Sequence, residues 1–470
     1  MTSILQQLQA NLDGPGGDWS TECVRMAQIY NWAYLTISTN TTQNLLDSLC
    51  QTNRAETRQR RPNDAISTAY KNAHRAQPVL WIATFWKMVL EGGPIGDRAW
   101  CLQERQLSPK VLHLIDDGNV VFECTGIVAS SASEQSTSEF VTDPRHARIL
   151  SRPYPRVLLP RVVDLIKKDA GMFDCMRFWY SVFSDYQKRQ MTYRTDNLIA
   201  LQGVAELVTR SGEYTYLSGI WLEDLARGLL WARNNAGDKG DANAETRRQA
   251  WTRFDNYQGP SWSWCSVKGS TRIFGIEKGL SGMWEVDMKY KQKGADRGNN
   301  RYPLISSFKV SPVHSGDGVR PWQEGSYLQV EGLIGRFHYI AGRWDNTGHL
   351  KPSSDAPVSY LDCGSIIFDI PSEWRSRDVW CLPIASPPGT SDNPWRPEYL
   401  ALAMEPLDAT HLQIAPGLAL QDAGVPSFKR LGLAIMQLHC DFGLGLDEEG
   451  KSLHELQQFG FQMVSQIRLF

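Results

Sequence analysis

The spacing of apolar side chains predicts a helix near the start of the chain and a strand directly after it. Residues 19–31 carry apolar side chains at helical spacing, and Asp18 before them is a preferred N-cap residue type. Residues 34–39 are rich in β-branched and aromatic side chains, which favours a strand. A helix followed by a strand is the order expected of an α/β domain.

A second helix is predicted over residues 98–108, where the apolar spacing is again helical and a proline follows. Gln103 and Glu104 fall on the arc of this helix that faces the core. Such a pair is either a buried brace, hydrogen-bonded to Arg98 or Arg105, or part of a functional site. The sequence leaves both interpretations open.

A hairpin is predicted after this helix. Asp117-Gly118 stands between the apolar runs 111–115 and 120–124, which is the signal of a two-residue type I′ turn. This turn places His113 opposite Phe122, on an apolar face, where it is either a hydrogen-bonded core imidazole or a site residue. The brace interpretation predicts four side chains that are largely buried and close together: Trp100, Gln103, Glu104 and His113.

A chain of 470 residues exceeds what one core normally fills, so two or three domains are expected. A Ser-rich linker at 129–139 ends the first domain, and helical spacing dominates residues 155–233. Beyond residue 301, short apolar runs between Gly and Pro are typical of antiparallel strands. The predicted strands are 326–333, 365–370, 379–384, 399–404 and 429–436. The predicted domains are an incomplete α/β domain (1–128), a helical region (140–290) and an antiparallel β-rich domain (300–470).

Trp262 and Trp264 are predicted to lie on one face of an extended segment, with Ser261, Ser263 and Cys265 on the other face. Two large aromatic side chains on one face can pack in a core or offer a platform to a ligand. Core packing is the favoured interpretation of this pair.

Composition narrows the classes of partner and of site. A net charge of −2 argues against general binding of nucleic acid. The N-terminus lacks an apolar signal core and no stretch is long and apolar enough to span a membrane, so the protein is predicted to be soluble and cytoplasmic. Nine cysteines without a Cys-x-x-Cys pair indicate neither a disulfide framework nor a zinc module, and His439-Cys440 lacks a partner cluster. No metal site is predicted.

Glu22 is the carboxylate that stands out. It falls inside the apolar stripe of the first helix, between Met26 and Ile29, although the opposite face already supplies polar side chains. Burial raises the pKa of a carboxyl group, as expected for a residue that performs acid-base or charge-stabilising chemistry. The alternative is a buried ion pair with Arg25, three residues on. The residues alone leave these two interpretations open.

Four stretches, in the same order along the chain, resemble the signature of the fungal heterokaryon-incompatibility (HET) domain. They are Asp18-Trp19-x-x-Glu22-x-x-x-Met26-x-x-Ile29-Tyr30, Arg98-x-Trp100-x-Leu102-Gln103-Glu104-Arg105-x-Leu107-Ser108-Pro109-x-Val111-Leu112-His113, Asp196-Asn197-Leu198-x-Ala200-x-x-Gly203-x-Ala205, and Pro260-Ser261-Trp262-Ser263-Trp264. The resemblance implies a role in nonself recognition between fused hyphae and in regulated cell death. It also implies a protein partner or self-association.

HET domains are regarded as similar to Toll/interleukin-receptor (TIR) domains, whose NAD-cleaving members carry a glutamate in a Trp-x-x-Glu helix. Trp19-Ser20-Thr21-Glu22 is similar to that motif. The resemblance therefore implies a TIR-like α/β fold, NAD as a substrate, and Glu22 as the group that stabilises positive charge on ribose as nicotinamide leaves.

The chain departs from the HET pattern at its start. Complete HET domains begin with further strands, and a segment such as Ser3-Ile4-Leu5-Gln6 is at most a remnant of these. Nucleotide sites form at the C-terminal ends of such strands, so their loss counts against binding and cleavage of NAD.

Two other classes of function stay open. The first is a binding or scaffold module without chemistry, which the missing strands favour. The second is a small-molecule enzyme of a fungal secondary-metabolite pathway, in which the Trp-rich regions enclose an apolar substrate. The residues that carry a candidate polar site, or a structural brace, are Trp19, Gln103, Glu104, Arg105 and His113.

Overall fold

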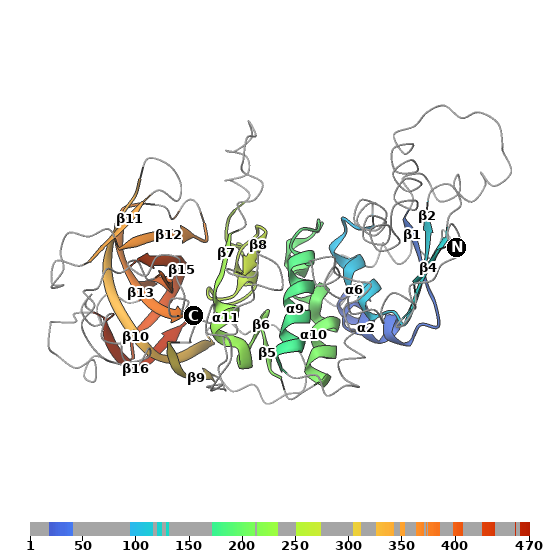
Figure 1. Ribbon diagram of the computed structural model, residues 1–470, viewed down its shortest axis with the longest axis horizontal. Coiled ribbons are helices and arrows are strands. Elements are labelled where there is room, and N and C mark those ends of the chain that lie inside the picture. The colour runs from blue at the N-terminus through green and yellow to red at the C-terminus, as the bar shows by residue number, and fades with distance from the viewer. Residues whose placement is uncertain are drawn as a thin grey trace, which may run out of the picture. The chain divides into compact units, whose positions relative to one another are not determined.

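The structure, a computed structural model, describes part of the chain (Figure 1). The described residues are 18–40, 95–115, 120–124, 128–130, 172–211, 214–233, 251–273, 304–311, 326–342, 348–352, 363–370, 373, 375–385, 398–407, 425–437, 456 and 461–470. Three of the expectations, the remnant at Ser3–Gln6, the turn at Asp117-Gly118 and the pair His439-Cys440, lie outside them.

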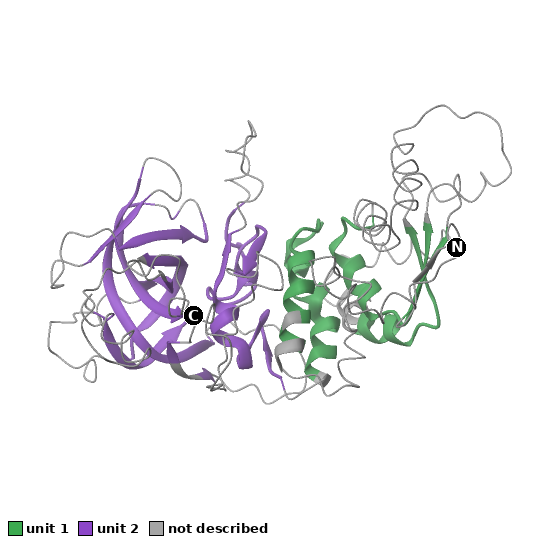
Figure 2. Cartoon of the chain, viewed as in Figure 1, with its two compact units in different colours: residues 1–213, 279–281 green, residues 214–278, 282–470 purple. Residues whose placement is uncertain are grey.

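Two compact units make up the chain (Figure 2). Unit 1 comprises residues 1–213 and 279–281, and unit 2 comprises residues 214–278 and 282–470. This division differs from the three predicted domains, because helices from the predicted middle region pack with the first helices of the chain to form unit 1. The predicted linker at 129–139 begins within a strand, and its remaining residues lie outside the described part.

Unit 1 combines four helices with one sheet among its described residues. The helices are α2 (Asp18–Trp32), α6 (Ala99–Leu107), α9 (Met172–Tyr186) and α10 (Ile199–Ser211). The strands lie in the order β1 (Thr36–Asn40), β2 (Lys110–Ile115), β3 (Val120–Cys124) and β4 (Val128–Ser130). The first two helices, with the strands that follow them, match the predicted elements to within two residues.

Pairing within this sheet is mixed. The strands β1 and β2 are parallel, whereas β2 with β3 and β3 with β4 are antiparallel. A parallel pair requires a crossover connection, and α6 stands directly before β2 in the chain. The helix-strand alternation of the predicted α/β domain is therefore present, and a TIR-like fold stays a prediction.

The first part of unit 2 is less helical than predicted. The strands β5 (Tyr216–Leu217) and β6 (Ile220–Trp221) form a short hairpin, which is followed by η6 (Leu222–Asp224) and by one short helix, α11 (Leu225–Leu229). The strands β7 (Trp231–Arg233) and β8 (Thr271–Ile273) form a second antiparallel pair.

The predicted extended conformation at the tryptophan pair is wrong. Residues 261–266 form a turn that leads into a 3₁₀ helix, η7 (Trp264–Ser266), because the Ser263 hydroxyl accepts a hydrogen bond from the Cys265 amide at 3.2 Å. Core packing is confirmed, since both tryptophans are buried. The Trp264 indole donates to the Gly219 carbonyl at 2.9 Å, in a turn where a Cβ on Gly219 would collide with the indole.

The remainder of unit 2 is a mainly antiparallel β region, as predicted. All five predicted strands are present: β10 (Tyr327–Ile340), β12 (Gly364–Phe368), β13 (Arg377–Ala385), β14 (Glu398–Pro406) and β15 (Ser427–Gln437). Three more strands occur that the apolar pattern did not predict: β9 (Ile305–Ser311), β11 (His349–Pro352) and β16 (Gln462–Leu469).

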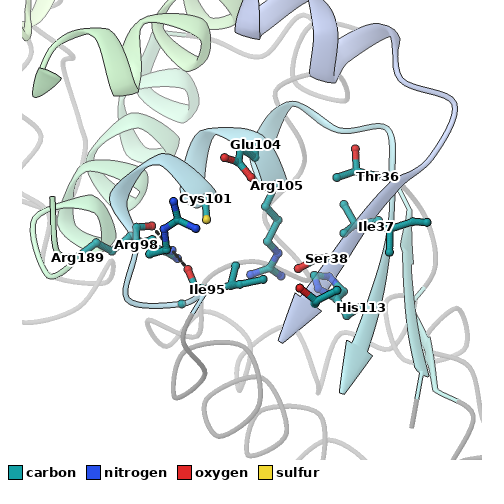
Figure 3. A pocket seen from close by; sticks show the side chains of 13 residues that line it. Thr36, Ile37, Ser38, Ile95, Arg98, Cys101, Glu104, Arg105, His113 and Arg189 are labelled. Atoms are coloured by element: carbon teal, nitrogen blue, oxygen red, sulfur yellow. Dashed lines mark hydrogen bonds between the residues drawn. The ribbon is translucent and has the colours of Figure 1, made fainter. Parts of the chain in front are cut away.

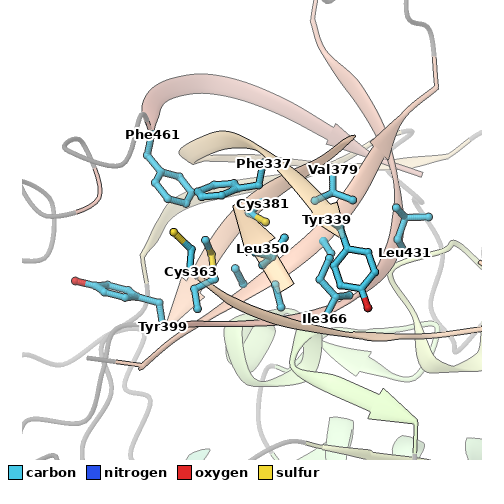
Figure 4. Close-up of a cluster of buried hydrophobic side chains, with 14 of the residues drawn as sticks. Phe337, Tyr339, Leu350, Cys363, Ile366, Val379, Cys381, Tyr399, Leu431 and Phe461 are labelled. Atoms are coloured by element: carbon cyan, nitrogen blue, oxygen red, sulfur yellow. The ribbon is translucent and has the colours of Figure 1, made fainter. Parts of the chain in front are cut away.

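Five of these strands close into a ring, in which β10, β13, β14, β15 and β16 each pair with the next and β16 returns to β10. The pair of β15 with β16 is parallel, and the other four pairs are antiparallel. The ring encloses an apolar core (Figure 4). Aromatic rings meet inside it, with 5.2 Å between the ring centroids of Phe337 and Phe461 and 5.0 Å between those of Tyr339 and Phe368. Burial of such rings is the main stabilising term of this region.

One arginine ties the first part of unit 2 to the ring of strands. The Arg430 side chain, on β15, is fully buried; it donates to the carbonyls of Leu229 and Trp231 and to the Asp369 carboxylate, which is also fully buried. Its guanidinium also lies 3.7 Å from the ring centroid of Trp231. A buried guanidinium with this many acceptors is compensated, so it joins the two parts of the unit without leaving an isolated charge.

Candidate functional site

A pocket of about 220 Å³ lies in unit 1 between β1, α6 and β2 (Figure 3). Three of the predicted site residues line it, namely Glu104, Arg105 and His113. Arg98, at the start of α6, and Ser38, on β1, line it as well. The pocket is therefore built from charged and hydroxyl groups that come from separate segments of the chain.

Contacts with α9 fix the helix that carries most of these groups. The Arg189 guanidinium, just after α9, donates to the backbone carbonyl of Arg98 at 3.2 Å and is held by the carboxylate of Asp185 at 3.0 Å. The Ala99 amide donates in turn to the Gln190 carbonyl at 2.9 Å. These bonds give the first amide of α6 a partner that the helix itself cannot supply, and they hold the start of α6 against the segment that follows α9.

Arg105 and His113 meet on one carboxylate at the edge of the pocket. Arg105 donates to both carboxylate oxygens of Glu123, at 2.9 and 3.1 Å, and His113 Nε2 donates to Glu123 Oε2 at 3.0 Å. Burial opposes ionisation of Glu123, but the charge of Arg105 and the hydrogen bond from His113 outweigh it and lower the pKa of this carboxyl to about 2. Glu123 is thus ionised, and it joins helix α6 to the hairpin.

The pKa of His113 is also lowered, although its contact with the Glu123 carboxylate favours the charged imidazole. Burial lowers it below its usual range, the bond to Glu123 raises it, and the nearby Arg105 charge lowers it again. The imidazole is consequently neutral at physiological pH. It holds a proton on Nε2 and points into the sheet face that borders the pocket.

The predicted hairpin register was wrong by one residue. His113 pairs with Val121 and Leu112 pairs with Phe122. Five residues separate the paired Leu114 and Val120, and this odd number excludes a regular two-residue turn. Because side chains alternate between faces, the shift brings Glu123 onto the face of His113 and moves Phe122 to the other one.

Glu104 lies on the pocket wall with a different set of partners. Burial raises the pKa of its carboxyl group above the usual range, although the charge of Arg98 and hydrogen bonds from the Tyr30 hydroxyl and the Cys101 thiol oppose that rise. The same burial raises the pKa of Cys101 to about 11, so its thiol is protonated. Glu104 is the one carboxylate on the described pocket wall, and its raised pKa is typical of a residue at a functional site.

Trp100 and Gln103 face another helix instead of the pocket. The Trp100 side chain is hydrogen-bonded to the carboxylate of Asp196, and the Gln103 carbonyl oxygen accepts a bond from the Gly203 amide at 2.9 Å. A Cβ on Gly203 would lie 2.8 Å from the Ala27 Cβ, so glycine permits the close approach of α10 to α2. Three of the four HET-like stretches thus pack directly on one another in unit 1.

The four side chains of the predicted brace therefore do not form one cluster of mutual hydrogen bonds. Gln103 and His113 are buried, whereas Trp100 and Glu104 are half-buried. The hydrogen bonds described above join these four side chains to other residues and not to one another, on α10, β3, α2, α6 itself and the segment before α10. The link between helix and hairpin does exist, but Arg105 and Glu123 make it.

Glu22 and Trp19 lie in α2, and their side chains are outside the described part of the structure. The buried side of this helix differs from the predicted apolar arc, since Ile29 is 52% exposed. Ala27 approaches α10, and Tyr30 reaches Glu104. The assignment of Glu22 as a catalytic residue stays a prediction.

Sequence reasoning missed two polar residues of this region, Ser38 and Glu123. Ser38 sits directly beside His113 in the parallel register of β1 and β2. Only the sheet pairing brings these two together, because 74 residues separate them in the numbering. Glu123 was present in the predicted hairpin, but the incorrect register placed it on the opposite face from His113.

Comparison with family models, with curated proteins and with solved structures finds no match to this chain. Within the described residues, no group of His, Cys, Asp and Glu side chains has the arrangement of a metal site. The described helices also include none that is long and apolar enough to cross a membrane.

Proposed function

We propose that this chain is a HET-type protein of nonself recognition and regulated cell death, acting in the cytoplasm, and that the pocket of unit 1 cleaves the bond between nicotinamide and ribose in NAD. The observation that carries the proposal is the position of Glu104, a carboxylate of raised pKa on the wall of a pocket that also holds Arg98 and hydroxyl groups. The HET-like stretches of the sequence supply the choice of NAD.

The size and lining of the pocket suit one end of this substrate. A volume of about 220 Å³ is below the roughly 300–1,000 Å³ of pockets that enclose a whole drug-sized ligand. It fits a ribosyl group with its base, with Ser38 and Thr36 beside the ribose hydroxyls. Arg98, which is exposed at the rim, is the cation that fits the neighbouring phosphate.

In this reaction the bond from ribose C1′ to the nicotinamide nitrogen breaks, and the electron pair leaves with nicotinamide. Positive charge develops on the ribose ring, and an ionised carboxylate beside it lowers the barrier. Water then adds to C1′ and gives a proton to the carboxylate. Glu104 is proposed for both steps, in place of or together with Glu22.

The test is release of nicotinamide from NAD by the full chain. Glu104→Gln keeps the shape and the acceptor for Tyr30 but removes the charge, and it should lower the rate by about 10² to 10³. Glu22→Gln, measured alongside, decides which carboxylate is responsible. Asp255→Asn removes a carboxylate that is 95% exposed in unit 2, and it should leave the rate unchanged.

A second candidate function, a scaffold without chemistry, is favoured by one specific observation. The polar residues of the HET-like stretches contact each other across unit 1, as in the bonds of Gln103 with Gly203 and of Trp100 with Asp196. Such bonds fix the packing of helices and need no substrate. If the full chain releases no nicotinamide, the scaffold function becomes the better conclusion.

A further inference from the structure

Exposed apolar side chains gather at one place in unit 1. Ten large apolar side chains are exposed in the described part of the chain, and five of them lie within residues 29–37. We call this group the apolar strip; its members are Ile29, Trp32, Tyr34, Leu35 and Ile37. Trp32 is 78% exposed, Tyr34 84% and Ile37 61%.

The strip is large enough to matter energetically. At about 150–250 Å² for each aromatic side chain, Trp32 and Tyr34 alone expose roughly 300 Å². Contiguous apolar patches of roughly 300–600 Å² are the largest on a typical monomer and often mark an interaction site. With its aliphatic neighbours, the strip can form the apolar centre of an interface that buries about 800 Å² on each partner.

The strip continues from the end of α2 into the strand at the edge of the described sheet. In the described pairing β1 contacts β2 on one side and ends the strand order on the other. An edge strand offers a row of backbone donors and acceptors to another strand. Natural edges are usually protected by a charged side chain or a proline, and β1 has the sequence Thr-Ile-Ser-Thr-Asn, which contains neither.

The distribution of charged residues around the strip bears on which partner it can bind. The sequence from Met26 to Leu46 contains no Asp, Glu, Lys or Arg, and the neighbouring strand β2 brings one charge to the strip, the Lys110 ammonium, which lies 4.4 Å from the ring centroid of Tyr34. The strand β1 itself is uncharged, so two copies of it can pair around a two-fold axis without like charges meeting between the paired strands. Aromatic side chains of one copy then pack on the β-branched Ile29 and Ile37 of the other.

We propose that the apolar strip, with the open edge of β1, is a self-association surface that pairs two copies of this chain. The inference deepens the self-association that the proposed function implies, and it names the surface responsible. Ile37 and other residues of β1 line the pocket, whereas Trp32 and Tyr34 do not. Association is therefore tested at Trp32 and Tyr34, where a substitution changes no residue of the pocket lining.

The experiment is the molar mass of the full chain by sedimentation over a wide range of protein concentration. The mass should rise towards that of a dimer, and Trp32→Ser with Tyr34→Ser should weaken the association at least about tenfold. Tyr193→Ser is the matched control, because Tyr193 is 65% exposed in the same unit but outside the strip. Nicotinamide release by the double variant reports whether the pocket remains intact.

Amide exchange provides the second measurement. Amides of β1 should exchange more slowly at high protein concentration in the native chain, and this slowing should vanish in the double variant. A chain that stays monomeric overturns the proposal, including one whose β1 amides are already protected because the chain covers its own strip. A dimer that the double variant leaves unchanged, or that Tyr193→Ser weakens equally, overturns it too.

Discussion

The carboxylate of Asp369 and the guanidinium of Arg430 form a fully buried ion pair, with hydrogen bonds of 2.9 and 3.2 Å. Arg430 completes its shell with backbone carbonyls from the segment before the ring of strands. Neither charge is near water, so each depends on the other for its compensation.

Removing one partner of this pair should therefore be costly. Asp369→Asn leaves the guanidinium buried without its counter-charge and should lower the free energy of unfolding of unit 2 by about 3–5 kcal/mol. Denaturant unfolding followed by tryptophan fluorescence measures the change. Asp369→Leu combined with Arg430→Met removes both charges and should cost less than Asp369→Asn alone; a double variant at least as unstable would show that charge compensation is not the reason.

Glu123 predicts an acid-dependent loss of stability. Its pKa is depressed in the folded state, to about 2, so its contribution is present above the ordinary pKa of glutamate and is lost as pH falls from about 4.5 towards 2. Glu123→Gln should destabilise unit 1 by roughly 1–3 kcal/mol at pH 7, because Arg105 and His113 lose a charged acceptor. Thermal midpoints across this pH range should converge for the two proteins at the acid end, and a constant difference would contradict the prediction.

For Glu104 we expect the opposite dependence of stability on pH. Its pKa is raised in the folded state, so ionisation favours unfolding and stability declines as pH rises above the ordinary value for glutamate. Glu104→Gln should therefore become more stable relative to the native chain as pH rises above the ordinary pKa of glutamate. Glu104→Ala instead orphans the Tyr30 hydroxyl and should destabilise by roughly 1–3 kcal/mol. Melting temperatures of the three proteins at several pH values check both statements, and an unchanged midpoint in the alanine variant contradicts the second.

Gly203→Ala should destabilise unit 1, although alanine is the better helix former by about 1 kcal/mol. The added Cβ would lie 2.8 Å from both the Ala27 Cβ and the Leu107 Cδ1, which forces α10 away from its neighbours and should cost about 1–3 kcal/mol. Ala27→Gly removes one of these two contacts and should restore part of the loss in the double variant. If Gly203→Ala raises the melting temperature, helix propensity outweighs packing here.

Local patterns in the sequence predicted most elements but not the pairing between them. The helix at residues 19–31 and the five C-terminal strands follow from periodicity, which depends only on neighbours in the chain. The strand β16 escaped because its buried residues, Val464, Ile467 and Leu469, do not alternate strictly. The turn at Asp117-Gly118 suggested a register that the structure overturns, because pairing also depends on which face the core covers.

In the candidate site too, residues with a local sequence signal were predicted and residues brought in by tertiary packing were not. Glu104, Arg105 and His113 were identified from their positions on a helix and a strand, and all three line the pocket. Ser38 and Arg189 reach it from β1 and from the end of α9, and no local pattern connects those segments. Glu104 finds its partner in Tyr30, on a helix more than seventy residues earlier in the chain. Contacts of this kind arise from tertiary packing alone.

The bonds of Arg430 also constrain how unit 2 forms during synthesis. They join Arg430 to Leu229 and Trp231, which stand 201 and 199 residues earlier in the chain. The β5–β8 segment is therefore made long before the strand that anchors it, and its buried tryptophans lack their full cover until β15 has left the ribosome. Contacts so distant in sequence form slowly. Unit 2 is thus expected to depend on chaperones during translation, whereas unit 1, whose described segments all precede residue 213, can complete its fold earlier.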